Sequence, residues 1–322
     1  MGLQKTDLER WIEIDKSYLQ KYQIKKSLIH THRDEVTCAS PECKGPAHEA
    51  LLLLVDVLTQ RYPSMFVKPN GHSIKNLVTG DMWDLKPSST NWEKYHPLEV
   101  MGLLATDDFF ILENDPTTGV TALKGGCVCF PGKRICEPHL YLSDSADNQL
   151  TAGWKIEERV GLSLWQIHAG KVPHYEQALS KSMDRFFLRM KSGNLTSRFN
   201  YAIDDSDDLF RRHSHHNLSN EHDAPLLKLE DLHLRVERQV LQRLPESGAL
   251  LFSIRTYVTP ITEVTKDRAV AEALRTSTRS YDEKLSAYKN QPLWNDALQK
   301  HLSEVLGDDD LRQDSAVAEA AE

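Results

Sequence analysis

Histidine side chains are the groups in this chain whose type and placement best suit metal chemistry. His168 directly follows the apolar stretch Leu162–Ile167, so we expect it to leave the core on an ordered segment. An imidazole in that position can bind a metal ion through one ring nitrogen, or it can be a buried histidine that bonds a backbone carbonyl. The weaker candidates for metal binding are His96, His139, His174 and, as a thiolate, Cys129.

The remaining histidine and cysteine groupings do not have the spacing of a metal site. His213, His215 and His216 lie in a charged, Ser/Asn-rich segment with no apolar frame, which indicates a solvated loop. Cys127 and Cys129 are two residues apart, a spacing typical of neither a zinc site nor an iron–sulfur cluster. With five cysteines and no export signal, the chain is expected to carry reduced thiols in the cytoplasm.

Charge and hydropathy narrow the classes of partner. The net charge of -8 and pI near 6.0 argue against nucleic acid, because phosphate binding needs a basic balance or a dense basic stripe. The longest apolar run, Ala50–Val55, is far too short to span a bilayer. The start, Met1–Asp7, is mostly polar and unlike a secretory signal. It fits the loose N-myristoylation pattern at Gly2, but one acyl chain gives only marginal membrane binding. We therefore expect a cytoplasmic protein.

The elements that must position these residues begin with helices and continue with short strands. Helices are predicted over residues 7–30 and 47–60, the second with apolar residues most of the way round. Extended runs then follow, separated by turns that include Gly125–Gly126. Among them, Phe109–Leu112 and Val120–Leu123 are expected to be neighbouring strands.

The second half of the chain returns to helical spacing. A helix is predicted near residues 175–190, and another over 229–244, where apolar residues recur at every fourth position. A helical C-terminal region is expected to end near Leu306. Residues 249–258 alternate like a strand, with Leu250, Phe252 and Ile254 on one face and Ser253, Arg255 and Tyr257 on the other.

This order of elements predicts an α+β fold with an antiparallel sheet, because strands cluster in the middle with helices on both sides. One domain is expected over residues 1–306, followed by an acidic disordered tail over 307–322. There is no strand–helix alternation and no Gly-x-Gly-x-x-Gly run, so a Rossmann dinucleotide site is not expected. An oxidative enzyme without its own flavin or nicotinamide site must take electrons from elsewhere.

Four stretches have the residues, order and rough spacing of a known family, and the most specific is the stretch Glu237–Gly248 with Phe252–Tyr257. Together they make the chain from about Asp7 to Lys289 similar to the fungal branch of the haem-dependent oxidative N-demethylase alpha-subunit family. The stretches are Arg61–Phe66; Lys86–Trp92 with Pro97–Gly102 and Asp107–Phe109; Val128–Pro131 with Ile167–His168 and Ser182–Phe187; and Glu237–Gly248 with Phe252–Tyr257.

The resemblance implies a fold and a reaction. The fold is PAS-like: an antiparallel sheet with flanking helices, helical N- and C-terminal extensions, and a bound haem b. The reaction is that of a monooxygenase that uses O2 to oxidise a small amine. The bacterial relatives release formaldehyde and the shorter amine, with electrons from partner subunits that carry flavin and an iron–sulfur centre. A separate reductase is therefore the expected protein partner. The competing hypotheses are a haem-dependent tailoring enzyme of specialised metabolism and a non-catalytic haem or PAS-like sensor.

The resemblance also selects candidate site residues. His168 occupies the family's Ile-His position and is the expected axial ligand of the haem iron. Its surroundings depart from the family, because an insertion falls within residues 132–152 and Ala169–His174 replaces the usual Pro-Val-Pro. Glu99 is one carboxylate that could orient an amine, and catalytic residues are otherwise left open. Guanidinium groups pair well with haem propionates, and could equally form structural ion pairs. The candidates are Arg238, Arg255, Arg198 and Arg185.

Overall fold

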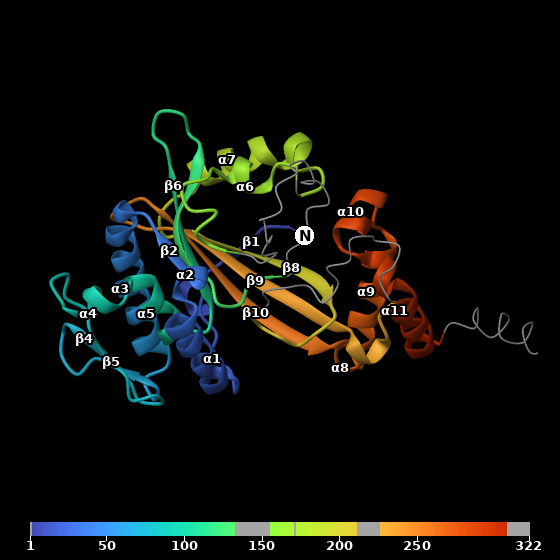
Figure 1. Cartoon of the computed structure of the whole chain (residues 1–322), viewed down its shortest axis with the longest axis horizontal. Helices are drawn as coiled ribbons and strands as arrows, with labels where there is room; N and C mark the ends of the chain where they lie inside the picture. Colours follow the sequence, from blue (N-terminus) through green and yellow to red (C-terminus); the bar gives the residue numbers. More distant parts are fainter. Residues whose placement is uncertain (1, 133–154, 171, 211–225, 308–322) are drawn as a thin grey trace, which may run out of the picture. The chain divides into compact units, whose positions relative to one another are not determined.

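The computed structural model describes residues 2–132, 155–170, 172–210 and 226–307 (Figure 1). Their contacts form two compact units. The first contains residues 2–131, 155–200 and 237–256, and the second contains 201–210, 226–236 and 257–307. The expected single domain over 1–306 stays a prediction. Within the described part of the chain, no helix is long and apolar enough to cross a membrane. The insertion, the tail over 308–322, and His139, His213, His215 and His216 lie outside the described residues.

The largest element of the described residues is a seven-stranded antiparallel sheet, which confirms the predicted α+β class (Figure 1). Its strand order is β1-β8-β9-β10-β6-β7-β2. The long strands β8, β9 and β10 contribute residues to both compact units. The strands are β1 (Gln4–Thr6), β2 (Thr37–Ala39), β6 (Asp108–Asn114), β7 (Thr121–Cys127), β8 (Leu195–Asp204), β9 (His233–Arg243) and β10 (Leu250–Pro260).

Two of the strand predictions are confirmed. β6 and β7 are antiparallel neighbours, with Phe109 opposite Cys127. β10 pairs with β6, with Phe252 opposite Phe110, and its side chains alternate as predicted. Leu250, Phe252 and Ile254 belong to one apolar cluster, whereas Ser253 accepts a hydrogen bond from Trp11 on the other face.

The helix predicted over residues 229–244 is wrong, because this segment forms β9 after the short 3-10 turn η5 (Leu229–Asp231). A repeat of four residues is also two strand periods, so apolar side chains at every fourth position satisfy both structures. The residues between them decide the outcome. Leu234 extends the even-numbered apolar face of the strand, and Leu241 packs in a cluster on the opposite face. Arg238 is therefore a strand residue.

The turn predicted at Gly125–Gly126 is also wrong, because both glycines lie inside β7. A Cβ at Gly125 would lie 2.7 Å from Cys43 Sγ and 2.8 Å from the Cβ of Ala39. Glycine is needed there because β2 and the turn η2 approach the backbone of β7 closely. The dipeptide marks a tight packing contact and not a break in the strand.

Helices and a small sheet complete the first unit. The helix predicted over 47–60 is confirmed as α3, whereas the predicted 7–30 arm begins with a 3-10 turn and becomes helical only at Tyr18. The small sheet has the order β3-β4-β5. These elements are η1 (Leu8–Arg10), α1 (Tyr18–Thr31), α2 (Arg33–Val36), η2 (Pro41–Cys43), α3 (Lys44–Arg61), β3 (Phe66–Val67), β4 (Ser73–Asn76), β5 (Met82–Asp84), α4 (Asn91–Lys94) and α5 (Pro97–Leu104), followed later by α6 (Leu164–His168), the π-helix η3 (Tyr175–Leu179) and α7 (Ser180–Arg189).

The second unit packs C-terminal helices on its own apolar core. Trp294, Leu298 and Leu302 lie on one face of the last helix and are buried with Leu234 of β9. The predicted helical C-terminal region is thus confirmed up to its end at Leu306. Its helices are α8 (Ile261–Val264), α9 (Arg268–Arg279), α10 (Glu283–Tyr288) and α11 (Gln291–Leu306).

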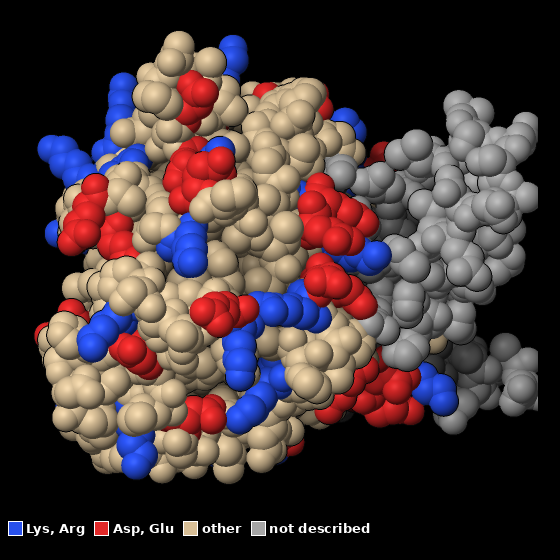
Figure 2. All heavy atoms as spheres, turned by 60° about the vertical axis from the view of Figure 1, so that its left-hand side comes forward, with Lys and Arg blue, Asp and Glu red and all other residues tan. Residues whose placement is uncertain are grey.

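Charged side chains of both signs are scattered over one face of the molecule (Figure 2). On the face that Figure 2 shows, acidic and basic groups are interspersed, and neither sign covers a broad area. The net charge of -8 is therefore not gathered into one acidic patch on this face.

A buried ion pair joins α1 to the start of β6. Lys25 Nζ lies 2.6 Å from Asp108 Oδ1, with side chains 0% and 2% exposed. Lys25 also donates to the carbonyl of Asp107, while Asp108 accepts the backbone N–H groups of Cys129 and Phe130. Burial is the largest single influence and opposes the charge of Lys25, but the interactions with Asp108, Cys129 and Cys127 together outweigh it and raise the pKa of the ammonium group. The pair thus fixes one helix and two segments of the sheet to each other.

We expect Lys25→Met to lower the free energy of unfolding by about 3–5 kcal/mol, because it leaves a buried carboxylate without a cation. The double variant Lys25→Met/Asp108→Asn should be more stable than Lys25→Met, since no uncompensated charge remains. Urea denaturation measures both differences. The matched control is Lys26→Met on the same helix, because Lys26 pairs with Asp81 at an exposed position and should contribute less than about 1 kcal/mol. Equal losses at the two positions would contradict a special role of the buried pair.

Candidate functional site

His168 is the last residue of α6 and is held in a defined orientation. Ser163 and Gln166 form a capping box that begins this short helix. His168 Nδ1 lies 2.7 Å from the carbonyl oxygen of Leu164. A carbonyl oxygen can only accept, so Nδ1 carries the hydrogen, and Nε2 of the neutral ring carries the lone pair. This is the tautomer that a histidine needs in order to bind iron through Nε2.

Tyr175 packs flat against His168. The two rings are stacked, with centroids 5.0 Å apart and planes at 20°, and Tyr175 is 2% exposed. Tyr175 begins the π-helix η3, and the preceding His174 is left-handed with a φ of 60°. π-helical turns and left-handed non-glycine residues are enriched at functional sites, where the surrounding structure imposes them. The backbone is therefore locally strained at His174 and Tyr175.

An apolar cluster lies next to His168 in the first unit. Leu164 and Ile167 of α6 pack in the same cluster as Phe110 of β6 and Phe252 of β10. The rings of Phe110 and Phe252 stack with centroids 5.5 Å apart. The cluster also includes Met183, Phe186, Phe187 and Met190, which belong to the segment near residues 175–190 that was predicted to be a helix.

A row of polar side chains continues this face of the sheet. Gln239 and Glu237 precede Leu241 at two-residue intervals on β9, so all three point to the same side as the apolar cluster. Arg198 Nε of β8 donates to Gln239 Oε1 at 2.6 Å, and Gln239 Nε2 donates to Glu237 Oε2 at 3.0 Å. Asn200 Nδ2 donates to the same Glu237 oxygen at 3.4 Å. We call Arg198, Gln239, Glu237 and Asn200 the polar row.

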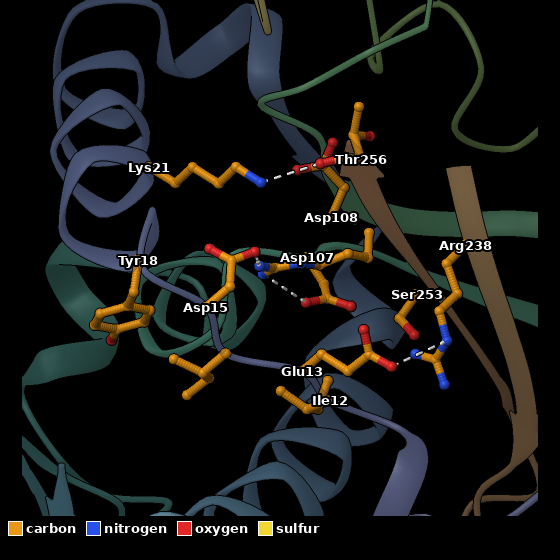
Figure 3. A network of polar contacts seen from close by, with 12 residues as sticks. Ile12, Glu13, Asp15, Tyr18, Lys21, Asp107, Asp108, Arg238, Ser253 and Thr256 are labelled. Carbon is orange, nitrogen blue, oxygen red and sulfur yellow. Dashed lines mark hydrogen bonds and ion pairs between the residues drawn. The ribbon is translucent and has the colours of Figure 1, made fainter. Parts of the chain in front are cut away.

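Arg238 and Arg255 point to the opposite face of the sheet and hold the N-terminal segment. Figure 3 shows Arg238 directed at Glu13. Arg238 donates to the carbonyl of Trp11 at 2.9 Å, and its Nε lies 3.7 Å from a carboxylate oxygen of Glu13. Arg255 donates to Asp15 at 2.5 Å and lies 3.8 Å from Asp107. Each guanidinium therefore has structural partners on the side away from His168.

The other sequence candidates have separate positions. Arg185 is exposed on α7 and donates to the carbonyl of Lys181. Glu99 is fully buried, and its two oxygens accept from Arg33 at 2.7 Å each. One of these oxygens also accepts the backbone N–H of His96, which completes the cap of α5. Burial lowers the pKa of His96 to about 4. Glu99 and His96 thus serve the start of a helix.

The structure places Arg198 against Gln239, on the sheet face that also carries Leu241 of the apolar cluster next to His168. Arg238 and Arg255 lie on the opposite face. Tyr175 and Glu237 were not among the candidates from the sequence. The period-two pattern of Glu237, Gln239 and Leu241 could have indicated the polar row, but only if the segment had been recognised as a strand. No sequence signal marks the stacking of Tyr175 on His168.

The chain matches one protein-family model over most of its length. A family model described as haem-dependent oxidative N-demethylase, alpha subunit-like, matches residues 2–134 and 135–299. The chain therefore belongs to this family of haem-dependent, N-demethylase-like proteins.

The residues of the first unit have the chemistry that a haem requires. His168 offers a nitrogen donor of fixed tautomer, and the apolar cluster offers aromatic and aliphatic surface for a porphyrin. Arg198 is exposed, and among the described residues its hydrogen bond is the one from Nε to Gln239. Its two terminal nitrogens can therefore pair with a propionate. This donor set fits the group that the family name implies.

Asp107 lies at the centre of the N-terminal network and is expected to make it sensitive to pH. Burial raises the pKa of Asp107 to about 6, although Arg255 and Lys25 oppose the shift. Its Oδ2 is buried without a hydrogen bond. Lys21 donates to the carbonyl of Thr256 in the same network, and burial lowers the pKa of its ammonium group to about 8 (Figure 3).

Because the pKa of Asp107 is raised in the folded protein, its contribution to stability is greatest below about pH 4 and is lost as the pH rises through about 6. We expect the free energy of unfolding of the native protein to fall relative to Asp107→Asn across this range, by about 1–3 kcal/mol. Urea denaturation at pH 4.5, 5.5 and 7 measures the difference. The exposed Asp34→Asn variant is the control, and parallel pH profiles for native protein and Asp107→Asn would contradict the prediction.

Proposed function

We propose that this protein is a haem-dependent monooxygenase that oxidises a small amine, as its family name suggests. The observation that carries the proposal is the setting of His168. It occupies the family's Ile-His position, its Nδ1–H is fixed by a backbone carbonyl, and its helix packs in the apolar cluster. The antiparallel sheet with packed helices is consistent with the PAS-like fold inferred from the sequence.

Haem b, when bound, supplies an iron centre that activates O2. Within this proposal, His168 holds the iron, and Leu164 holds the imidazole in the tautomer that can do so. Tyr175 fixes the plane of that ring by stacking. Arg198 pairs with a propionate from the same face, and Arg185 is the second choice for that role. Arg238 and Arg255 hold the fold from the other face.

The remaining parts of the proposal are the substrate and the electron source. The family name supports an N-methylated amine, whose oxidation would release formaldehyde and the shorter amine. Because the sequence contains no dinucleotide fingerprint, a separate reductase would supply the electrons. Formaldehyde produced from a secondary amine by the haem-loaded protein, O2 and a working reductase tests the reaction itself. A Soret band with no substrate-dependent oxygen consumption would indicate a haem sensor instead.

His168→Ala tests the ligand. We expect the variant to fold, since His168 is half-buried at the end of a short helix, but to lose or shift the Soret absorption band after haem is added. The matched control is His72→Ala, because His72 is exposed, and its spectrum should equal that of the native protein. An unchanged spectrum in His168→Ala would transfer the assignment to His174, His139 or Cys129. The absence of a Soret band in the native protein would overturn the proposed function.

A further inference from the structure

We propose that helix α7 carries the docking surface for the electron donor, and that this donor is a protein with an acidic face. The inference rests on the proposed function, since it assumes a haem that receives electrons from a separate protein. It adds a location on this chain and a charge for the partner, which the family match does not give.

Three basic side chains form a stripe along the outside of α7. Lys181, Arg185 and Arg189 follow each other at intervals of four residues, so they lie on successive turns of one side of the helix. All three are exposed. We call them the basic stripe. The chain as a whole has a net charge of -8, so this side of α7 differs in sign from the average of the protein.

The charges of the basic stripe are not neutralised by the described residues. Within those parts of the chain, no carboxylate forms an ion pair with any of the three side chains. Arg185 Nε donates to the carbonyl of Lys181, which leaves its charge unpaired. Glu176, just before the helix, accepts the backbone N–H of Gly170 at 3.1 Å. The stripe therefore presents positive charge that an acidic partner can pair with.

The other side of α7 faces the proposed haem site (Figure 1). Phe186 and Phe187 pack in the apolar cluster together with Leu164 and Ile167, which belong to the helix that ends at His168. A helix with its side chains is about 10 Å across, so a partner on the basic stripe lies about that far from the cluster. An electron donor has to come this close, because the rate of electron transfer falls steeply with distance.

An exposed apolar contact lies beside the basic stripe. Leu188 comes seven residues after Lys181, which returns it to the same side of the helix, and it is 48% exposed. A Cβ at Gly119 would lie 3.0 Å from Cδ1 of Leu188, and the neighbouring Val120 is 40% exposed. Protein interfaces combine an apolar centre with a charged rim, and this arrangement has both.

The burial of α7 favours a protein partner over an anionic membrane. An amphipathic helix binds a lipid surface by inserting its apolar face. In α7 that face is already packed in the apolar cluster, so the basic stripe and Leu188 are what a partner can reach.

The test measures how fast a reduced, acidic [2Fe–2S] ferredoxin reduces the ferric, haem-loaded protein in a stopped-flow spectrophotometer. One electron passes from the reduced cluster to the ferric iron, so the ferredoxin is oxidised as the iron becomes ferrous, and no bond forms or breaks. We expect Lys181→Gln/Arg189→Gln to lower the second-order rate constant about 5- to 20-fold at an ionic strength of about 0.01 M, where charges steer association. At about 1 M the two proteins should react equally, because the charges are screened. Calorimetry with oxidised ferredoxin should show a matching loss of affinity at low salt.

Two control variants separate the basic stripe from a general effect of charge. Lys75→Gln/Lys94→Gln removes the same charge from exposed positions on β4 and α4 and should change the rate constant less than about twofold. Lys181→Arg/Arg189→Lys keeps both charges and should react like the native protein. A neutral deazaflavin radical needs no docking surface, so it should reduce all of these proteins equally. All of them should keep the native Soret band, since the substituted side chains are exposed.

Four results would overturn the inference and leave the proposed function intact. The first is an equal rate constant for the native protein and Lys181→Gln/Arg189→Gln at low salt. The second is a native rate constant that rises with ionic strength, which would indicate a basic partner. The third is a native protein that deazaflavin reduces but ferredoxin does not. The fourth is binding of the native protein, but not of the variant, to phosphatidylserine vesicles, which would assign the stripe to a membrane. A native protein without a Soret band would instead remove the proposed function.

Discussion

Buried cations each require oxygen acceptors, and this requirement organises the first unit, where Arg238 and Arg255 lie on one face of the main sheet. Lys25, Arg238 and Arg255 are all less than a tenth exposed. Lys25 is paired with the carboxylate of Asp108, and Arg255 with that of Asp15. Arg238 donates to backbone carbonyls of the N-terminal segment. An unpaired buried charge costs several kcal/mol, so detaching the N-terminal segment or α1 would cause a large loss of stability.

The opposite face of the same strands is organised differently. There the apolar cluster takes side chains from α6 and α7, and the polar row is linked by amides. Amide groups can hold a charged group in place without neutralising it, and Gln239 bonds both Arg198 and Glu237. The two faces of one sheet thus carry two different polar networks, one built on buried ion pairs and one linked by amides.

The sequence alone was sufficient to predict an element and the direction of its side chains where the local pattern of residues agrees with the tertiary environment. The strand over residues 249–258 alternates between apolar and polar side chains, and its two faces meet an apolar cluster and a polar network as predicted. It was insufficient at β9, where apolar residues four apart fit both a helix and a strand. The sequence was also insufficient to predict the roles of Arg238 and Arg255. A guanidinium group in a specific motif can bind a haem propionate or form a buried structural ion pair equally well. Only the partner across the fold distinguishes the two, and that partner, the N-terminal segment, is more than two hundred residues away in sequence.

The most specific stretch of the family resemblance therefore combines two constraints in one run of residues. In β9 the odd-numbered Glu237, Gln239 and Leu241 face the cluster around His168, whereas the even-numbered Arg238 faces the N-terminal segment. In β10 the assignment is reversed, because Phe252 and Ile254 join the cluster while Arg255 binds Asp15. A substitution at one position changes the face that carries the apolar cluster and the polar row, and a substitution at the next position changes a contact with the N-terminal segment. Alternation along two strands is enough to place both kinds of residue side by side in sequence while keeping them on opposite sides of the sheet.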